Sequence, residues 1–291
     1  MPLITVFTPT YNRAALLTRV FYSLCQQTYQ DFEWIVVDDG STDDTENEVL
    51  HFKEQSKKFL VRYIKKRNGG KHTAINMGVR EAKGELFLIL DSDDSLPKDS
   101  LQNIVHAYEC IQDNMAVGGI CGCMAHHDGS KIGNYVGQGP LDMSSLEMRY
   151  KFKITGDLCE VFKTEILRSF PFPEIMEENF CPEALIWNRI ANRYKLRMLD
   201  KVLYYRDYLD GGLTSKMTKI RMQNPIATCQ TYSELLDYNI PFGSKVKASI
   251  NFCRFHPCLQ GVSSMSIPFL WNIFRPIGLL MHHYDKRKVC K

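Results

Sequence analysis

An aspartate-rich segment, Asp91-Ser92-Asp93-Asp94, directly follows the apolar residues 86–90. Three carboxylates crowded at the end of one strand repel each other unless a positive group lies between them. A divalent cation such as Mg²⁺ or Mn²⁺ would fill that role, because hard ions prefer carboxylate oxygens and complete their coordination shell with substrate phosphates. The alternative is a solvated turn, since Asp, Ser and the nearby Pro97 are also common loop residues.

Two further polar segments follow predicted strands earlier in the chain. The turn Pro9-Thr10-Tyr11-Asn12 ends a strand predicted at residues 5–8, and a carboxylate-rich loop at residues 38–44 ends another at residues 32–37. Apolar residues at helical spacing predict helices at 16–24 and 73–82, and residues 60–64 predict a further short strand. Strands that alternate with helices favour a parallel sheet, whose ligands bind outside the carboxyl ends of the strands. We therefore expect the three polar segments to lie close together at one edge of the sheet, where the parallel strands have their carboxyl ends.

This series of segments resembles the family 2 glycosyltransferases, which have the nucleotide-diphosphosugar transferase fold called GT-A. The matching residues, in the family's order, are 8–13, 27–33, 37–43, 68–70, 74–78, 84–85 and 91–94. The resemblance implies an α/β fold with a mostly parallel central sheet flanked by helices and followed by a helical C-terminal extension. We expect a nucleotide-sugar-binding half at 1–117, an acceptor-binding half of the same catalytic domain at 118–217, and the extension at 218–291.

The resemblance also implies a nucleotide-sugar donor, with a UDP-sugar as its expected form. Thr8, Pro9 and Tyr11 would form the floor and wall for a pyrimidine base, and Asp39 would accept a hydrogen bond from the base N3–H. This bond does not separate UDP from dTDP, since uracil and thymine present the same donor. Arg13, in the same motif as Tyr11, is also expected to contact the donor. Capping of the following helix is the alternative role for Asp39.

Phosphate, sugar and metal contacts are implied for the remaining motif residues. Lys71 follows two glycines and would reach a phosphate as a mobile charge, with an exposed loop lysine as the alternative. Asp91 would contact the ribose or the donor sugar, and Ser92 is expected to contact the donor beside it. The cofactor would be Mn²⁺ or Mg²⁺, held by Asp93 and Asp94, either of which is a candidate for the direct ligand.

The second half is expected to supply the catalytic base and the acceptor site. Residues 156–162 and 198–206 predict a short strand and an edge strand, and a helix begins at Pro182-Glu183. Family members place an acidic residue at the start of this helix, often within an acid–Asp pair, so the resemblance makes Glu183 the general base. Pro182 departs from that pair, which leaves Asp157 and Glu160 as the next candidates. We expect those two to bind acceptor hydroxyls, and stabilisation of the helix dipole is the alternative role for Glu183.

The mechanism that follows is a single displacement that inverts the anomeric centre. The metal would stabilise the charge that develops on the leaving nucleoside diphosphate. No covalent intermediate is needed, and no motif for a nucleophilic triad stands out. The resemblance implies transfer of a hexosyl or N-acetylhexosaminyl group to a glycan or polyprenol-linked acceptor, in bacterial surface polysaccharide synthesis. The alternatives are a sugar-nucleotide nucleotidyltransferase, which needs a glycine-rich basic first turn, and a non-catalytic nucleotide- or carbohydrate-binding module.

Composition is that of an ordinary globular protein of 291 residues, with 44% hydrophobic and 24% charged residues. A net charge of only +3 argues against a nucleic-acid partner. Ten cysteines without a secretory leader predict reduced thiols and a cytoplasmic location. Cys121 and Cys123 with His126 and His127 form a loose cluster that lacks the second cysteine pair of a structural zinc site.

The tail at residues 218–291 lies outside the resemblance. Its apolar run at 267–281 is interrupted by prolines and Arg275, falls short of a membrane span, and is followed by Lys286-Arg287-Lys288. One interpretation is an interfacial helix that holds the enzyme on the inner face of the cell membrane near a lipid-linked acceptor. The other is a set of helices that packs against the catalytic core or a partner chain.

Overall fold

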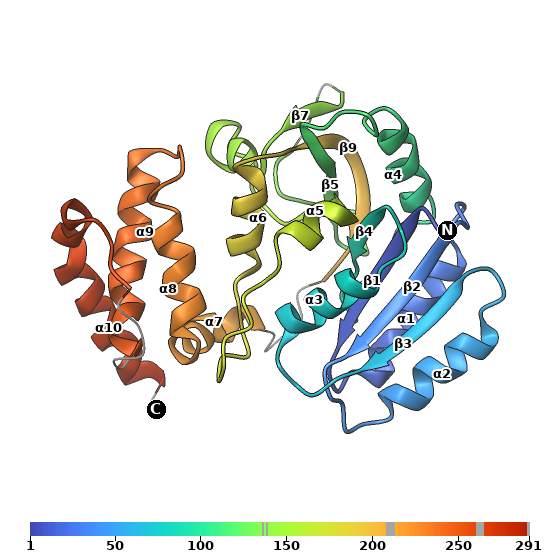
Figure 1. Cartoon of the computed structure of the whole chain (residues 1–291), viewed down its shortest axis with the longest axis horizontal. Helices are drawn as coiled ribbons and strands as arrows, with labels where there is room; N and C mark the ends of the chain where they lie inside the picture. Colours follow the sequence, from blue (N-terminus) through green and yellow to red (C-terminus); the bar gives the residue numbers. More distant parts are fainter. Residues whose placement is uncertain (136, 138, 208–212, 260–264, 290–291) are drawn as a thin grey trace. The chain divides into compact units, whose positions relative to one another are not determined.

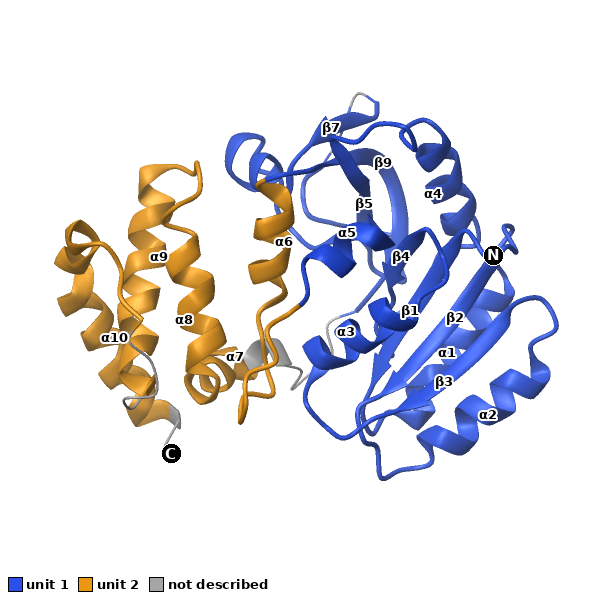
Figure 2. Ribbon diagram, in the orientation of Figure 1, with its two compact units in different colours: residues 1–171, 193–207 blue, residues 172–192, 208–291 orange. Residues whose placement is uncertain are grey.

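The computed structural model describes residues 1–135, 137, 139–207, 213–259 and 265–289. The chain forms two compact units, which are coloured separately in Figure 2. The first contains residues 1–171 and 193–207, and the second contains residues 172–192 and 208–291. The predicted functional division at residues 117 and 217 stays a prediction.

The first unit is built on one mixed sheet in the order β3-β2-β1-β4-β8-β5-β9-β7, with β6 paired to β5 (Figure 1). Strands β1, β2, β3 and β4 are parallel, whereas β8 pairs antiparallel with both β4 and β5. The strands are β1 (Ile4–Thr10), β2 (Phe32–Asp38), β3 (Leu60–Lys65), β4 (Leu86–Ile89), β5 (Val117–Ala125), β6 (Lys131–Ile132), β7 (Leu141–Met143), β8 (Leu158–Lys163) and β9 (Lys195–Tyr205).

Helices cover both faces of the sheet, which explains the near-continuous apolar strands. Buried residues of α1 (Ala14–Cys25), α2 (Thr45–Gln55) and α4 (Ser100–Glu109) share one core with the strands. In that core Phe21 stacks on Phe52 with ring centroids 4.5 Å apart. On the other face α3 (Lys71–Glu81) contacts β1 and the short helix α5 (Thr164–Ser169). A Cβ at Gly78 would lie 2.3 Å from the ring of Phe7, so glycine sets the close approach of α3 to β1.

The sequence patterns predicted the strands β1 to β4, β8 and β9 to within a few residues. The strand predicted at residues 198–206 is present as β9, which pairs with β5 on one side. On its other side the three-residue strand β7 pairs only with Leu196, Arg197 and Met198, and a strand as short as β7 has no readable alternation in the sequence.

The second unit is helical. Its α-helices are α6 (Glu183–Ala191), α7 (Leu213–Gln223), α8 (Pro225–Glu234), α9 (Phe242–Phe255) and α10 (Arg275–Val289), joined by the 3₁₀-helices η2 (His256–Leu259) and η3 (Phe269–Phe274). The buried carboxylate of Glu178 accepts hydrogen bonds from the first backbone amides of α8, at Ile226 (2.6 Å) and Ala227 (2.9 Å). Among the described residues, no helix combines the length and apolar character that crossing a membrane requires.

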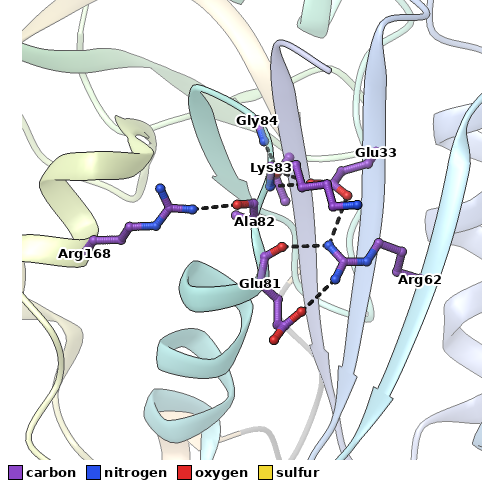
Figure 3. Close-up of polar contacts among 8 residues, drawn as sticks. Glu33, Arg62, Glu81, Ala82, Lys83, Gly84 and Arg168 are labelled. Atoms are coloured by element: carbon purple, nitrogen blue, oxygen red, sulfur yellow. Dashed lines mark hydrogen bonds and ion pairs between the residues drawn. The ribbon is translucent and has the colours of Figure 1, made fainter. Parts of the chain in front are cut away.

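A buried carboxylate joins the amino ends of the strands. Glu33 in β2 is 1% exposed and accepts hydrogen bonds from the Thr5 hydroxyl (2.8 Å) and the Lys83 backbone amide (2.7 Å). Arg62 in β3 donates to Glu33 (3.3 Å) and to the Glu81 carboxylate (2.7 Å), as Figure 3 shows. A single side chain therefore ties β1, β2, β3 and the turn before β4 together.

We predict that Glu33→Ala lowers the free energy of unfolding by about 3 kcal/mol, because it leaves a buried hydroxyl, a backbone amide and part of an arginine without an acceptor. Glu81→Ala is the matched control, since Glu81 binds the same arginine from a position 45% exposed. Its cost should be about 0.5 kcal/mol. Urea denaturation of both variants measures the difference, and equal losses would contradict a central role for Glu33.

Candidate active site

Three polar turns meet at the carboxyl edge of the parallel strands. The register pairs Pro9 with Val37 and Thr10 with Asp38, and β4 lies on the other side of β1. The residues that follow these strands, Tyr11, Asp39 and Asp91, therefore leave the same edge of the sheet.

The Asp39 carboxylate is held by the loop before α3. It accepts hydrogen bonds from the Lys66 ammonium (2.6 Å) and from the backbone amides of Gly69 (2.9 Å) and Gly70 (2.7 Å). Gly40 has φ +86° and an added Cβ would lie 2.9 Å from the Asn68 backbone nitrogen, so glycine is required for this close approach. Asp39 is only 4% exposed, which makes it a rigid acceptor whose orientation is fixed before any ligand binds.

The turn after β1 presents Tyr11 and buries Thr8. The Thr8 hydroxyl accepts a hydrogen bond from the Trp34 indole (2.9 Å) and is fully buried, so this side chain supports the strand from inside the core. Asn12, at φ +52°, donates its backbone amide to Ser41 (2.8 Å) and accepts from the Thr42 amide (2.8 Å). With the turn held by these hydrogen bonds, Tyr11 is 49% exposed.

The aspartates after β4 have separate partners. The Asp91 carboxylate pairs with Lys71 at the start of α3 (2.7 Å). The Asp93 carboxylate pairs with Arg13 from the turn after β1 (2.9 Å). The Asp91 and Asp93 side chains are 29% and 20% exposed, but the Asp91 oxygen that faces Lys71 is buried. Ser92, between them, is buried.

Asp94 is turned inward. It is 2% exposed and accepts a hydrogen bond from the Tyr204 hydroxyl (2.7 Å), which in turn accepts from the Asp91 backbone amide (2.9 Å). Burial raises the pKa of Asp94 to about 7, and the charges of Asp91 and Asp93 add to that rise. Although burial raises the pKa of Asp91, the attraction of Lys71, Arg206 and Arg13 lowers it overall.

Arg206, directly after β9, joins the aspartates to a predicted acceptor residue. It donates to the Asp157 carboxylate (2.9 Å), and its charge attracts Asp91 and Asp94. Glu160 lies in β8 opposite Cys121 and is half-buried. Sequence reasoning did not single out Tyr204 and Arg206, which follow Asp91 by more than 110 positions and have no local motif.

The carboxylates after β4 suit a hard cation whose coordination shell the protein fills only in part. Asp93 offers a partly exposed carboxylate with Asp91 close by, whereas Asp94 is buried and inclined to hold a proton. The described residues contain no group of three or more His, Cys, Asp or Glu side chains that would hold a metal by themselves. Mg²⁺ and Mn²⁺ fit such a site, because they keep positions for water and substrate phosphates.

A chain of hydrogen bonds anchors the segment after the aspartates. The Ser95 hydroxyl lies 2.9 Å from His127 Nε2, and His127 Nδ1 lies 2.6 Å from the Asp207 carboxylate. His126 Nδ1 binds the other Asp207 oxygen at 3.1 Å. Serine, histidine and aspartate are connected in the order of a nucleophilic triad. The Ser95 backbone, however, is fixed by two hydrogen bonds that it exchanges with the Tyr205 backbone. We interpret the chain as an anchor between the ends of β4, β5 and β9.

Glu183 is the first residue of α6, which begins directly after Pro182 as predicted. It lies in the second unit and is half-buried. Its role as general base stays a prediction.

The raised pKa of Asp94 makes stability depend on pH. A carboxyl whose pKa rises from 3.8 in the unfolded chain to about 7 in the folded protein stabilises the fold fully below the lower value, and this contribution disappears as the pH rises through the higher one. We predict that the stability of the metal-free protein relative to Asp94→Asn falls by about 3 kcal/mol between about pH 5 and about pH 8. Denaturation of both proteins in EDTA measures it; a constant difference would contradict the buried, protonated Asp94.

The sequence is similar to a known family and to a named enzyme. The model of glycosyl transferase family 2 matches residues 5–163. The GalNAc(5)-diNAcBac-PP-undecaprenol beta-1,3-glucosyltransferase of Campylobacter jejuni is 30% identical over 227 residues, which cover 75% of this chain and 69% of that protein.

Solved structures share the fold. S. aureus TarS aligns with 99% of this chain at a TM-score of 0.64 and 18% identity, and the chain spans 54% of the TarS chain. TarS has also been solved with UDP and with UDP-GlcNAc. The mannosyltransferase PcManGT of Pyrobaculum calidifontis, solved with GDP-Man and Mn²⁺, aligns with 98% of this chain at a TM-score of 0.60 and 18% identity, over 88% of its own chain.

Proposed function

The chain belongs to glycosyl transferase family 2 and has the GT-A fold, and from that premise we propose that it transfers a sugar from a UDP-sugar to a hydroxyl group with inversion. The observation that carries the proposal is the pairing of Asp91 with Lys71 and of Asp93 with Arg13 at the carboxyl edge of the sheet. Two carboxylates and two mobile cations at one edge suit a nucleoside diphosphate and its metal.

The nucleoside would bind between Tyr11 and Asp39. The exposed Tyr11 ring offers apolar surface for a base, and Pro9 lies buried at the end of β1 behind it. Asp39 already accepts three hydrogen bonds, and a carboxylate has about four acceptor positions, so one remains for a base N3–H. The complexes of TarS with UDP and UDP-GlcNAc support uracil as the base.

Lys71, Arg13 and Ser92 would contact the rest of the donor. Arg13 and Lys71 are 35% and 39% exposed, and each would turn from its aspartate to a donor phosphate once the metal neutralises the carboxylates. Asp93 would be the direct ligand for Mn²⁺ or Mg²⁺, and Asp94 would support the segment through Tyr204, which also binds the Asp91 backbone amide. The bound metal supplies Lewis-acid stabilisation of the leaving diphosphate.

Glu183 would take the proton of the attacking acceptor hydroxyl, and Asp157 and Glu160 would bind acceptor hydroxyls. Glu183 lies at the first turn of α6, and a carboxylate there can accept the proton of a hydroxyl group as it attacks. The C. jejuni relative, named for an undecaprenol-linked substrate, supports a polyprenol-linked glycan as the acceptor. With such an acceptor, the enzyme would act in the cytoplasm at the inner face of the cell membrane, in surface polysaccharide synthesis.

The test is transfer from a panel of UDP-sugars, compared between the wild-type protein and Glu183→Gln. Loss of the base should lower kcat by about 10²–10⁴-fold while the affinity for UDP stays unchanged, because glutamine keeps the shape and removes only proton acceptance.

Glu177→Gln, an exposed glutamate before the same helix, is the matched control and should keep full activity. Full activity in Glu183→Gln would reject this residue as the base and move the test to Asp157 and Glu160. The absence of transfer from any nucleotide-sugar by the wild-type protein would contradict the proposal itself.

A further inference from the structure

In α10, the last helix of the second unit, small and polar residues lie on the face that packs against the rest of the unit. Gly278, His282 and Asp285 lie on the face of α10 that packs on α9: a Cβ at Gly278 would lie 2.5 Å from Cys253, and Asp285 is 6% exposed. His282 Nδ1 lies 2.9 Å from the Arg254 carbonyl. The positions three and four apart on this face are thus small or polar, whereas an ordinary surface helix buries its apolar side chains.

Three apolar side chains of α10 are exposed, whereas Leu279 and Met281 are partly buried. Ile277, Leu280 and Tyr284 are 48%, 72% and 60% exposed and lie three and four residues apart, on one outer face. η3 extends this surface with Phe269, Leu270 and Ile273, which are 90%, 82% and 75% exposed. These six residues, here called the apolar ridge, are large apolar side chains exposed on two consecutive helices, a concentration that is typical of an interaction site.

The part of the chain that contains the ridge is rich in basic residues. Between residues 241 and 291 the one acidic residue is Asp285, which is buried in an ion pair with Arg254. The same stretch contains eight basic residues: Lys245, Lys247, Arg254, Arg275, Lys286, Arg287, Lys288 and Lys291. With 3.6 residues per turn, Arg287 and Lys288 flank the outer face at Tyr284, and the Lys288 ammonium lies 4.6 Å from the centre of the Tyr284 ring.

We propose that the apolar ridge binds the surface of a bilayer that contains anionic phospholipids. Apolar side chains would enter the boundary between headgroups and acyl chains, while the flanking lysines and arginines reach phosphates on their flexible stems. Charge complementarity selects this partner over a second copy of the chain, because two copies meeting at the ridge would bring their uncompensated cations together.

Membrane binding goes beyond sugar transfer and does not depend on it. The ridge lies entirely in the second unit, whereas the aspartates and their cations lie in the first. A vesicle assay involves neither nucleotide nor acceptor, so its outcome is independent of the transfer assay.

The test is co-sedimentation of the full chain with two kinds of vesicle, one of phosphatidylcholine alone and one of equal parts phosphatidylcholine and phosphatidylglycerol. The wild-type protein should sediment with the anionic vesicles and release at high salt. The double variant Leu270→Glu/Leu280→Glu should lose about tenfold in partitioning for each replaced leucine. Lys286→Gln/Lys288→Gln should lose about fivefold per lysine on anionic vesicles alone.

The matched control is Leu60→Glu/Met115→Glu, which changes two exposed apolar residues of the first unit (53% and 79% exposed) and should bind like the wild type. Circular dichroism confirms that each variant is folded, and the lysine variant tests the proposal even where the leucine variant does not fold. Equal binding by all folded variants would overturn the proposal, as would absence of wild-type binding. A dimer that the ridge variants convert to monomers, with no vesicle binding, would assign the ridge to a second copy instead.

Discussion

Three carboxylates within four residues at the end of a buried strand must be compensated, and the arrangement of the candidate site follows from this electrostatic constraint. Lys71 neutralises Asp91, Arg13 neutralises Asp93, and Arg206 adds a third positive charge that attracts Asp91 and Asp94. Burial raises the pKa of Asp94 to about 7, so below that pH its proton removes one negative charge and with it the remaining repulsion. The cations come from the start of α3, the turn after β1 and the end of β9, so the charge cluster requires these elements to meet at one edge.

The strand β2 shows how the scaffold holds that edge in place. At its amino end, Glu33 joins three strands and the turn before β4 through buried hydrogen bonds. Beyond its carboxyl end, Asp39 fixes the loop that leads to Lys71 through two backbone amides and Lys66. Glu33 of this strand stabilises the sheet, and Asp39, directly after the strand, prepares the proposed nucleoside site.

The sequence predicted the local elements and the edge where they meet, because strand length, helical spacing and turn residues are local signals. It also identified family 2 through the segments at 8–13, 37–43 and 91–94. It did not predict contacts made across the sheet. Tyr204, Arg206 and the chain from Ser95 to Asp207 depend on β9 lying beside β5, and nothing in a linear pattern specifies that pairing. The burial of Thr8 against Trp34 was missed for the same reason, since the side of the sheet on which a hydroxyl lies is settled by packing. The outward apolar face of α10 was visible only as a hydrophobic run, because its direction is set by the close contact of Gly278 with α9.

The most direct test of the central claim is calorimetric titration of UDP into the protein, with and without Mn²⁺, beside Asp93→Asn and the exposed control Asp113→Asn. The account predicts that wild-type protein and the control bind UDP only weakly without metal. With Mn²⁺ their affinity should rise by more than about tenfold, and Asp93→Asn should lose that gain. Metal-independent UDP binding that Asp93→Asn leaves unchanged would contradict the claim that this carboxylate cluster is built to hold a metal and a diphosphate.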